Sequence, residues 1–174
     1  MHVHLLDNKI KQNLRRYLVQ VSFATIALFC TLLAEQVLVG GEEARAIVIA
    51  AIASTAFVLF ISPFSAAAKP RSAIGGHLIA ILVSIPLDFV AGSTFGDSVI
   101  TAVPYVFGFY AALGVGLTMF LMAATNTEHP PAAGTALAVV VHGFDWDLVL
   151  FMALAVSILV AIQRVFRHRF INLY

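Results

Sequence analysis

The sequence predicts an all-α fold, a polytopic transmembrane helix bundle of about six spans, and three observations support this class. Of the 174 residues, 61% are hydrophobic and only 11% are charged, with a mean hydropathy of +0.97. Soluble domains carry about 25% charged residues. Apolar runs close to the ~20 residues that a helix needs to cross a bilayer follow one another along the chain. The basic residues gather in alternate connections between those runs.

We expect a single transmembrane domain over residues 1–174, with no soluble regulatory domain and no cleaved signal peptide. The first run follows a charged segment, and the third contains His77 and Pro86. The fifth run is the shortest, because an acidic residue follows it closely at Asp145. The six predicted spans are 17–38, 45–64, 72–91, 99–124, 131–144 and 147–165.

The charge distribution predicts that both termini are cytoplasmic and that the short fifth run crosses the membrane. With six crossings, nine of the ten basic residues fall on the inside and only Arg45 falls outside, as the positive-inside rule expects. Without the fifth crossing, the basic segment RVFRHRF would lie outside. We therefore expect an integral protein of a bacterial inner membrane. The inside basic residues are Lys9, Lys11, Arg15, Arg16, Lys69, Arg71, Arg164, Arg167 and Arg169.

The stretch TNTEHPPAAGTALA, residues 125–138, interrupts the apolar sequence with an acid, a histidine and two prolines. A helix that starts at Pro130 and ends before Asp145 is only ~20 Å long, shorter than the ~30 Å hydrocarbon core. The His-Pro-Pro turn is therefore predicted to be recessed below the cytoplasmic surface. Backbone polar groups at that depth must be buried in protein or line a water-filled cavity, so we expect this stretch to line a cavity.

Two cytoplasmic corners share a layout at an offset of sixty residues, over 60–83 and 120–141. Each corner runs from Phe through small residues to Pro, and then into Gly and a new apolar run. The two hairpins would be parallel copies, and transporters with parallel repeats bind substrate where the copies meet. Chance similarity between two turn-bearing loops is the alternative that remains open.

Proline chemistry predicts that a helix begins near Pro70 and another near Pro130. Proline suits the first helical turn, where an N–H would be unpaired anyway, and it forces the preceding residue out of helical geometry. Free N–H groups and the positive end of the helix dipole make such a start an anion site. We therefore expect the two helix starts, both recessed on the cytoplasmic side, to hold a small anion together.

The candidate substrate-binding residues lie at these two corners. Histidines within membrane spans are rare and functional by default, which favours a role for His77. A role for His129 is favoured because two prolines fix its backbone and it lies at the recessed turn. For Lys69 and Arg71, ordinary positive-inside anchoring remains the alternative. Glu128 would pair with a nearby cation or carry a coupling proton. The full candidate set is Lys69, Pro70, Arg71, Ser72, Gly75, Gly76, His77, Glu128, His129, Pro130, Pro131, Gly134 and Thr135.

The segment EHPPAAGTALA resembles the signature of the HPP family of integral membrane proteins, and KPRSAIGGHLIA resembles its second signature, a Pro followed by Gly-Gly-His. The resemblance covers roughly 45–169, nearly the whole chain apart from the first span. It implies a nitrite carrier or channel, because family members are assigned nitrite transport in cyanobacteria and chloroplasts. Some relatives carry a C-terminal CBS domain, which we do not expect here.

The function that we favour from the sequence is transport of a small monovalent anion, nitrite first. The sequence leaves open channel or coupled carrier, and nitrite or nitrate or formate. An intramembrane enzyme is disfavoured because no HExxH, GxSxG or acid pair occurs on one span, and we expect no metal or cofactor. The alternative is a structural or sensory subunit that binds a protein through a stripe of small residues, Gly108, Ala112 and Gly116. We expect contact with membrane lipid and none with nucleic acid; a homo-oligomer is a further expectation.

Overall fold

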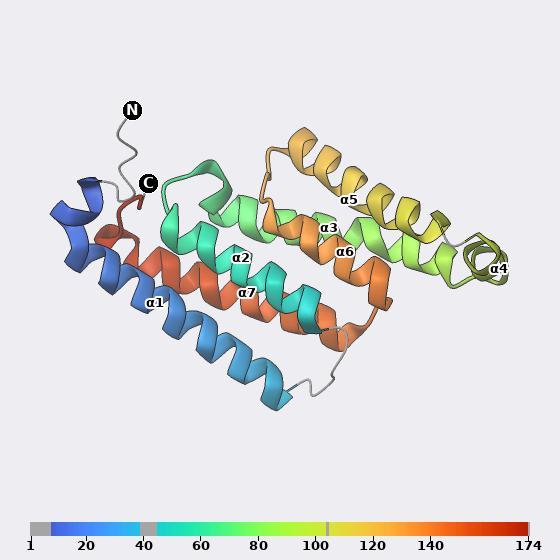
Figure 1. Ribbon diagram of the computed structural model, residues 1–174, viewed down its shortest axis with the longest axis horizontal. Helices are drawn as coiled ribbons and strands as arrows, with labels where there is room; N and C mark the ends of the chain where they lie inside the picture. The colour runs from blue at the N-terminus through green and yellow to red at the C-terminus, as the bar shows by residue number, and fades with distance from the viewer. Residues whose placement is uncertain (1–7, 39–44, 104, 174) are drawn as a thin grey trace.

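A computed structural model of the chain describes residues 8–38, 45–103 and 105–173, and all regular structure in these ranges is helical (Figure 1). The predicted all-α class is confirmed. The side chains of Lys9, Lys11 and Arg45, which are assigned to sides of the membrane from the sequence, lie outside the described residues. The helices are α1 (Asn8–Leu38), α2 (Arg45–Ile61), η1 (Ala66–Ala68), α3 (Pro70–Ala91), α4 (Thr94–Ala102), α5 (Tyr105–Thr125), α6 (Pro131–His142), α7 (Trp146–Phe166) and η2 (Arg167–Arg169).

Four of the described helices are long and apolar enough to cross a membrane: α1 over Asn13–Leu33, α3, α5 and α7. Two further apolar helices are shorter, α2 with 17 residues and α6 with 12. At 1.5 Å per residue α6 is about 18 Å long, well short of the ~30 Å hydrocarbon core. The crossing of α2 and α6 therefore stays a prediction.

The predicted fourth span, 99–124, is wrong at its start. Residues 99–102 belong to the separate helix α4, and the long helix α5 begins only at Tyr105. Val103 between them is extended, with φ −132° and ψ 90°, as expected for a residue that precedes a proline in the sequence. Hydropathy continues across this break, which is why the pattern of apolar residues concealed it. Each of the other five predicted spans falls on one helix.

The helices run back and forth, so that the α2–α3 and α5–α6 corners lie at the same end of the bundle as the start of α1 and the end of α7 (Figure 1). Gln20 ties this end together. Its amide nitrogen donates to the carbonyl oxygens of Phe60 and Ile171, and its amide oxygen accepts from Ile171 N at 3.0 Å. The side of the membrane that this end faces stays a prediction.

The core has two parts. The larger part joins α1, α2 and α7 through large buried side chains such as Phe60, Leu59 and Met152. The smaller part joins α3, α5 and α6, and its buried members are Ala80, Met122, Ala132 and Ala136. Because these residues are mostly small, the helix backbones approach one another closely there. The helix α6 is central to the bundle, since it contacts α2, α3 and α5.

The first turns of α3 lie very close to the corner that precedes α6. A Cβ added at Gly76 would lie 2.9 Å from the Cβ of His129 and 3.1 Å from the carbonyl oxygen of Thr127. A Cβ added at Gly75 would lie 2.9 Å from Cγ2 of Thr127. The two glycines therefore let the His-Pro-Pro corner rest directly on the α3 backbone.

We expect the substitution Gly76→Ala to destabilise the protein by about 1–3 kcal/mol, because the added methyl group overpacks a contact with His129 Cβ and the Thr127 backbone. The matched control is Gly108→Ala on α5, where no atom lies within 4 Å of the added group. The midpoint of thermal unfolding in detergent measures both. A Gly76→Ala midpoint equal to that of the wild type and the control would show that this contact is not tight.

Candidate functional site

Two histidines from different parts of the chain meet next to the start of α6. His77 lies on α3, two turns after its start, and His129 belongs to the connection before α6; their ring centroids are 5.2 Å apart. His77 is 3% exposed and His129 is fully buried. The helices that position them begin at Pro70 and Pro131, with Lys69 extended as expected before a proline. The predicted proline-initiated helix starts are confirmed.

A continuous chain of hydrogen bonds runs through the two histidines. His129 Nδ1 lies 2.8 Å from the carbonyl oxygen of Ala67, and its Nε2 lies 3.2 Å from Thr55 Oγ1. The same Thr55 hydroxyl lies 3.0 Å from His77 Nε2. His77 Nδ1 in turn lies 2.8 Å from Thr135 Oγ1. The chain therefore connects η1, the corner before α6, α2, α3 and α6.

Donor and acceptor rules fix the direction of this chain when both histidines are neutral. A carbonyl oxygen only accepts, so His129 Nδ1 carries a proton and donates to Ala67. His129 Nε2 is then an acceptor for the Thr55 hydroxyl, and Thr55 in turn accepts from His77 Nε2. His77 Nδ1 is left to accept from the Thr135 hydroxyl. Every ring nitrogen is satisfied without a charge.

The cluster also has a second arrangement that holds one more proton. Thr55 Oγ1 lies 2.9 Å from the carbonyl oxygen of Ala51, which offers an alternative acceptor for its proton. If the hydroxyl turns to Ala51, His129 Nε2 can carry a proton and donate it to Thr55. Burial lowers the pKa of His129 below its ordinary value, and the hydrogen bond to Ala67 acts in the opposite direction. The neutral arrangement is therefore favoured while the site is closed.

The predicted site residues divide by burial. The structure brings His77, His129 and Thr135 together, while Arg71 is exposed and donates from Nη2 to the Thr125 carbonyl oxygen at 2.8 Å. Ser72, Gly76, His77, His129, Pro131 and Thr135 are buried; Pro70, Gly75 and Gly134 are half-buried; Lys69, Arg71, Glu128 and Pro130 are exposed. Lys69 and His129 are sixty residues apart and so hold matching positions in the two corners, but Lys69 is exposed and His129 is buried.

The exposed Lys69 lines a basic cavity of about 280 Å³ between the start of α3 and the last turns of α7. Arg164 and Arg167 contribute two further cations, and no acidic side chain is among its lining residues. Arg167 Cζ lies 4.9 Å from the centroid of the Phe64 ring, and Gln163 Nε2 donates to the Pro63 carbonyl oxygen at 3.2 Å. We refer to this space as the α3–α7 cavity. It places three positive charges beside a helix N-terminus.

Sequence reasoning missed Thr55, Arg164 and Arg167 as site residues. Thr55 and Ser54 are the polar residues of an otherwise apolar helix α2 after Arg45, so a signal was present. That signal is weak, because a threonine within a helix can satisfy its hydroxyl on its own i−4 carbonyl. In the sequence, Arg164 and Arg167 stand out only as basic residues on the predicted inside of the membrane. Their approach to Lys69 depends on tertiary packing.

The described residues bear on the expected ion pair of Glu128 and on metal binding. Glu128 is exposed and forms no ion pair in that part of the chain, although pairing with a nearby cation was one expectation. Among the same residues, no group of three His, Cys, Asp or Glu side chains is placed to hold a metal ion.

Comparisons with known proteins give one family. The family description "HPP, transmembrane region" matches residues 9–172, which extends the resemblance to include α1. A transmembrane protein of Dictyostelium discoideum is 33% identical over 94 residues, which is 52% of this chain and 29% of that protein. The chain therefore aligns with less than a third of that relative. No solved structure matches the chain.

We expect Thr55→Val to destabilise the protein by about 1–3 kcal/mol, because the ring nitrogens of His77 and His129 lose their shared partner while they remain buried. Thr25→Val is the matched control: its hydroxyl also bonds an i−4 carbonyl, that of Val21, but is exposed. Thr55→Ser keeps the hydroxyl group and should therefore retain most of the wild-type stability. Denaturant titration in detergent measures the difference. Equal effects at positions 55 and 25 would remove Thr55 from the network.

Proposed function

This chain belongs to the HPP transmembrane family and is an integral membrane protein, and on that premise we propose that it transports a small monovalent anion, with nitrite as the first candidate. The observation that carries the proposal is the buried histidine–threonine chain beside the start of α6, close to the α3 backbone. We place the protein in a bacterial inner membrane, with six crossings and both termini cytoplasmic. We propose transport without chemical conversion of the anion.

The physical problem for such a protein is the cost of moving charge out of water. An isolated anion in hydrocarbon faces a Born cost of order 20 kcal/mol. The α3–α7 cavity supports the first step, in which Lys69, Arg164 and Arg167 attract the anion beside the free N–H groups of α3. Because these three side chains are exposed, water and salt screen them. They raise the local anion concentration without holding the ion tightly.

The histidine chain supports the second step. A proton taken up at the His129–Thr55 pair would supply a positive charge inside the bundle, and the anion would neutralise it. Anion and proton would then move as a pair that carries no net charge. The arrangement in which Thr55 turns to Ala51 supports this version, because it leaves no donor of the cluster unpaired. We therefore favour proton-linked transport over an open channel.

The conformation described here is closed. His129 is fully buried and Thr135 is 1% exposed, so water does not reach these side chains. Transport then requires the corner of residues 126–130 to move relative to α3. On the α3 side this contact is formed by the backbone at Gly75 and Gly76, which lies against the Thr127 side chain and His129 Cβ of the corner. The surface that has to open is therefore the contact between this corner and α3.

We expect purified protein in liposomes to pass nitrite, and His129→Asn to lower the flux about tenfold or more. The asparagine amide can still donate to Ala67, but it cannot take up a proton. Loss of a hydrogen bond to a charged group costs about 1.5–3 kcal/mol, and about 1.4 kcal/mol corresponds to a factor of ten. The matched control is His142→Asn at the exposed end of α6. Flux is measured by nitrite release, with folding checked by gel filtration.

Two results would count against this proposal. Wild-type flux in a well-folded His129→Asn protein would remove the histidine from the mechanism. No flux of nitrite, nitrate or formate by the wild type, at a pH of about 6 or about 8, on either side of the ordinary histidine pKa, would remove transport itself. The same series compares the three anions and records whether the vesicle interior acidifies with the flux.

One observation favours a second function, that of a structural or sensory subunit that binds another chain. Gly108 and Gly116 on α5 have no atom within 4 Å of an added Cβ, and Ala112 between them is exposed. The small-residue stripe is therefore not used by the described part of this chain. Small residues at such spacing allow transmembrane helices to approach closely, either in a homo-oligomer or with a different protein.

If this stripe is an interface, a bulky side chain at its centre should break it. We expect Ala112→Phe to abolish cysteine cross-linking between chains labelled on α5, because the ring holds the two helices apart. Leu121→Phe, an exposed site on the same helix, is the control. An unchanged cross-linking yield in Ala112→Phe, or no cross-linked product from the starting protein, would count against a homo-oligomer formed through this stripe.

A further inference from the structure

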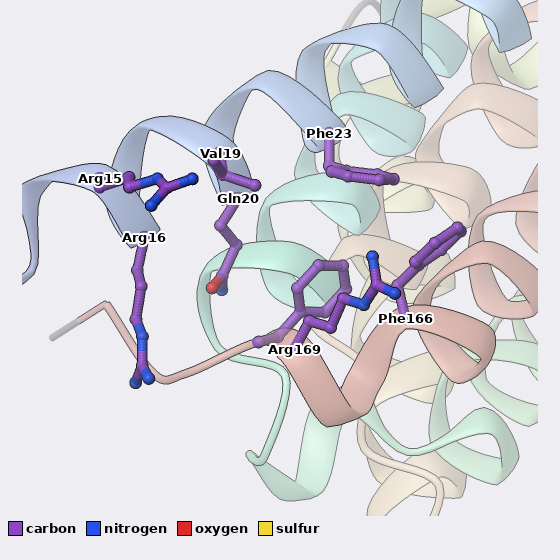
Figure 2. A pocket seen from close by; sticks show the side chains of 8 residues that line it. Arg15, Arg16, Val19, Gln20, Phe23, Phe166 and Arg169 are labelled. Atoms are coloured by element: carbon purple, nitrogen blue, oxygen red, sulfur yellow. The ribbon is translucent and has the colours of Figure 1, made fainter.

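A second basic cavity lies at the same end of the bundle, between the first turns of α1 and the end of α7. Its volume is about 290 Å³. Figure 2 shows Arg15 and Arg16 at one end of the cavity and the rings of Phe23 and Phe166 at the other, with the Arg169 guanidinium group beside Phe166. We call it the α1–α7 cavity. It is lined by Arg15, Arg16, Val19, Gln20, Phe23, Phe166, Arg169 and Phe170.

The positive charge of this cavity is not neutralised within the described part of the chain. Arg15 and Arg16 are exposed and form no ion pair there, and no acidic side chain lines the cavity. Arg169 donates from Nε to His168 Nε2 at 3.2 Å, and its Cζ lies 6.0 Å from the centroid of the Phe166 ring. These neighbours orient the guanidinium group but leave its charge uncompensated. The cavity therefore suits an anionic group.

The floor of the cavity is built from buried groups. Gln20 is 2% exposed and holds the backbone of Ile171 in both directions. Phe170 is buried, and the centroid of the Phe23 ring lies 4.7 Å from that of Phe166 and 6.2 Å from that of Phe170. The floor is thus apolar and held in place from both α1 and the C-terminal segment. The aromatic rings of this floor offer a small hydrated ion neither a charge nor a hydrogen-bond donor.

The α1–α7 cavity continues into an apolar groove along α1. This groove, about 320 Å³ in volume, is lined by Leu18, Val19, Ser22, Phe23 and Ile26, and it shares Val19 and Phe23 with the cavity. From Arg15 to Ile26 the helix rises about 16 Å. That is close to half of the ~30 Å hydrocarbon core, the depth of one leaflet. The charged mouth and the groove together match a molecule with an anionic head and an apolar tail.

We propose that this site binds an anionic phospholipid, with its headgroup at the mouth lined by Arg15, Arg16 and Arg169 and one acyl chain along Leu18, Ser22 and Ile26. Guanidinium groups pair with phosphate through two parallel hydrogen bonds, and basic pockets between membrane helices bind anionic headgroups. The α3–α7 cavity differs in its lining, which has no aromatic ring and includes only Ala68 and Pro70 as apolar residues. The lipid site is independent of the transported anion and of any proton coupling.

The test uses the full chain in detergent with equal amounts of dioleoyl phosphatidylglycerol and dioleoyl phosphatidylcholine, and native mass spectrometry counts the lipids that stay bound. We expect phosphatidylglycerol to be retained about a hundredfold over phosphatidylcholine, because each of the three arginines of the site contributes about fivefold. Inorganic phosphate added in excess should not displace it, because phosphate cannot fill the groove. Equal retention of the two lipids, or displacement by phosphate, would overturn the proposal using the wild type alone.

Variants then locate the site. The pair Arg15→Gln and Arg16→Gln should lower the preference for phosphatidylglycerol to about fivefold, the contribution of Arg169, whereas Arg164→Gln with Arg167→Gln, an equal loss of charge at the α3–α7 cavity, should leave it unchanged. Ser22→Trp, which fills the groove, should lower retention of phosphatidylglycerol while the arginines remain. Equal loss in both arginine pairs would indicate diffuse surface charge and overturn the proposal, as would full retention in Ser22→Trp.

Discussion

The hydroxyl group of Thr55 is the contact on which the site depends, because it lies within hydrogen-bond distance of Nε2 of both His77 and His129. Burying a polar group without a partner costs at least about 1–3 kcal/mol, and two imidazoles would otherwise incur that cost. The shared partner requires α2, α3 and the corner before α6 to meet at one point. The glycines of α3, the short helix α6 and the small side chains around it allow these elements to approach one another closely.

Permanent and titratable charges are separated in this molecule. The arginine and lysine side chains of both basic cavities line the end of the bundle, with Lys69, Arg164 and Arg167 exposed. His77 and His129 are inside and can be neutral. A buried guanidinium group would carry a desolvation penalty of several kcal/mol, whereas a histidine avoids it by releasing its proton. In the transport that we propose, an interior charge would appear only when a counter-ion accompanies it.

The two corners share a layout in the sequence but differ in three dimensions. Pro70 and Pro131 both start helices, but Lys69 faces solvent while His129 is buried against the Gly76 backbone. The difference follows from position, because α6 is enclosed by α2, α3 and α5, whereas the start of α3 lies beside the end of α7. One corner therefore presents a cation to water, and the other presents an imidazole to the interior.

The sequence by itself determined the features that depend on local chemistry. Apolar runs gave the helices, the prolines gave the starts of α3 and α6, and the paired signatures gave the family, which the match over residues 9–172 confirms. Local chemistry could also have located the break before Tyr105, since a proline stands at position 104, but the continuous hydropathy outweighed it. Only the tertiary structure decided that Thr55 joins the histidines and that Arg169 lines one cavity with Arg15. Such contacts depend on how helices far apart in the sequence pack together, and the pattern of residues within one segment contains no information about that packing.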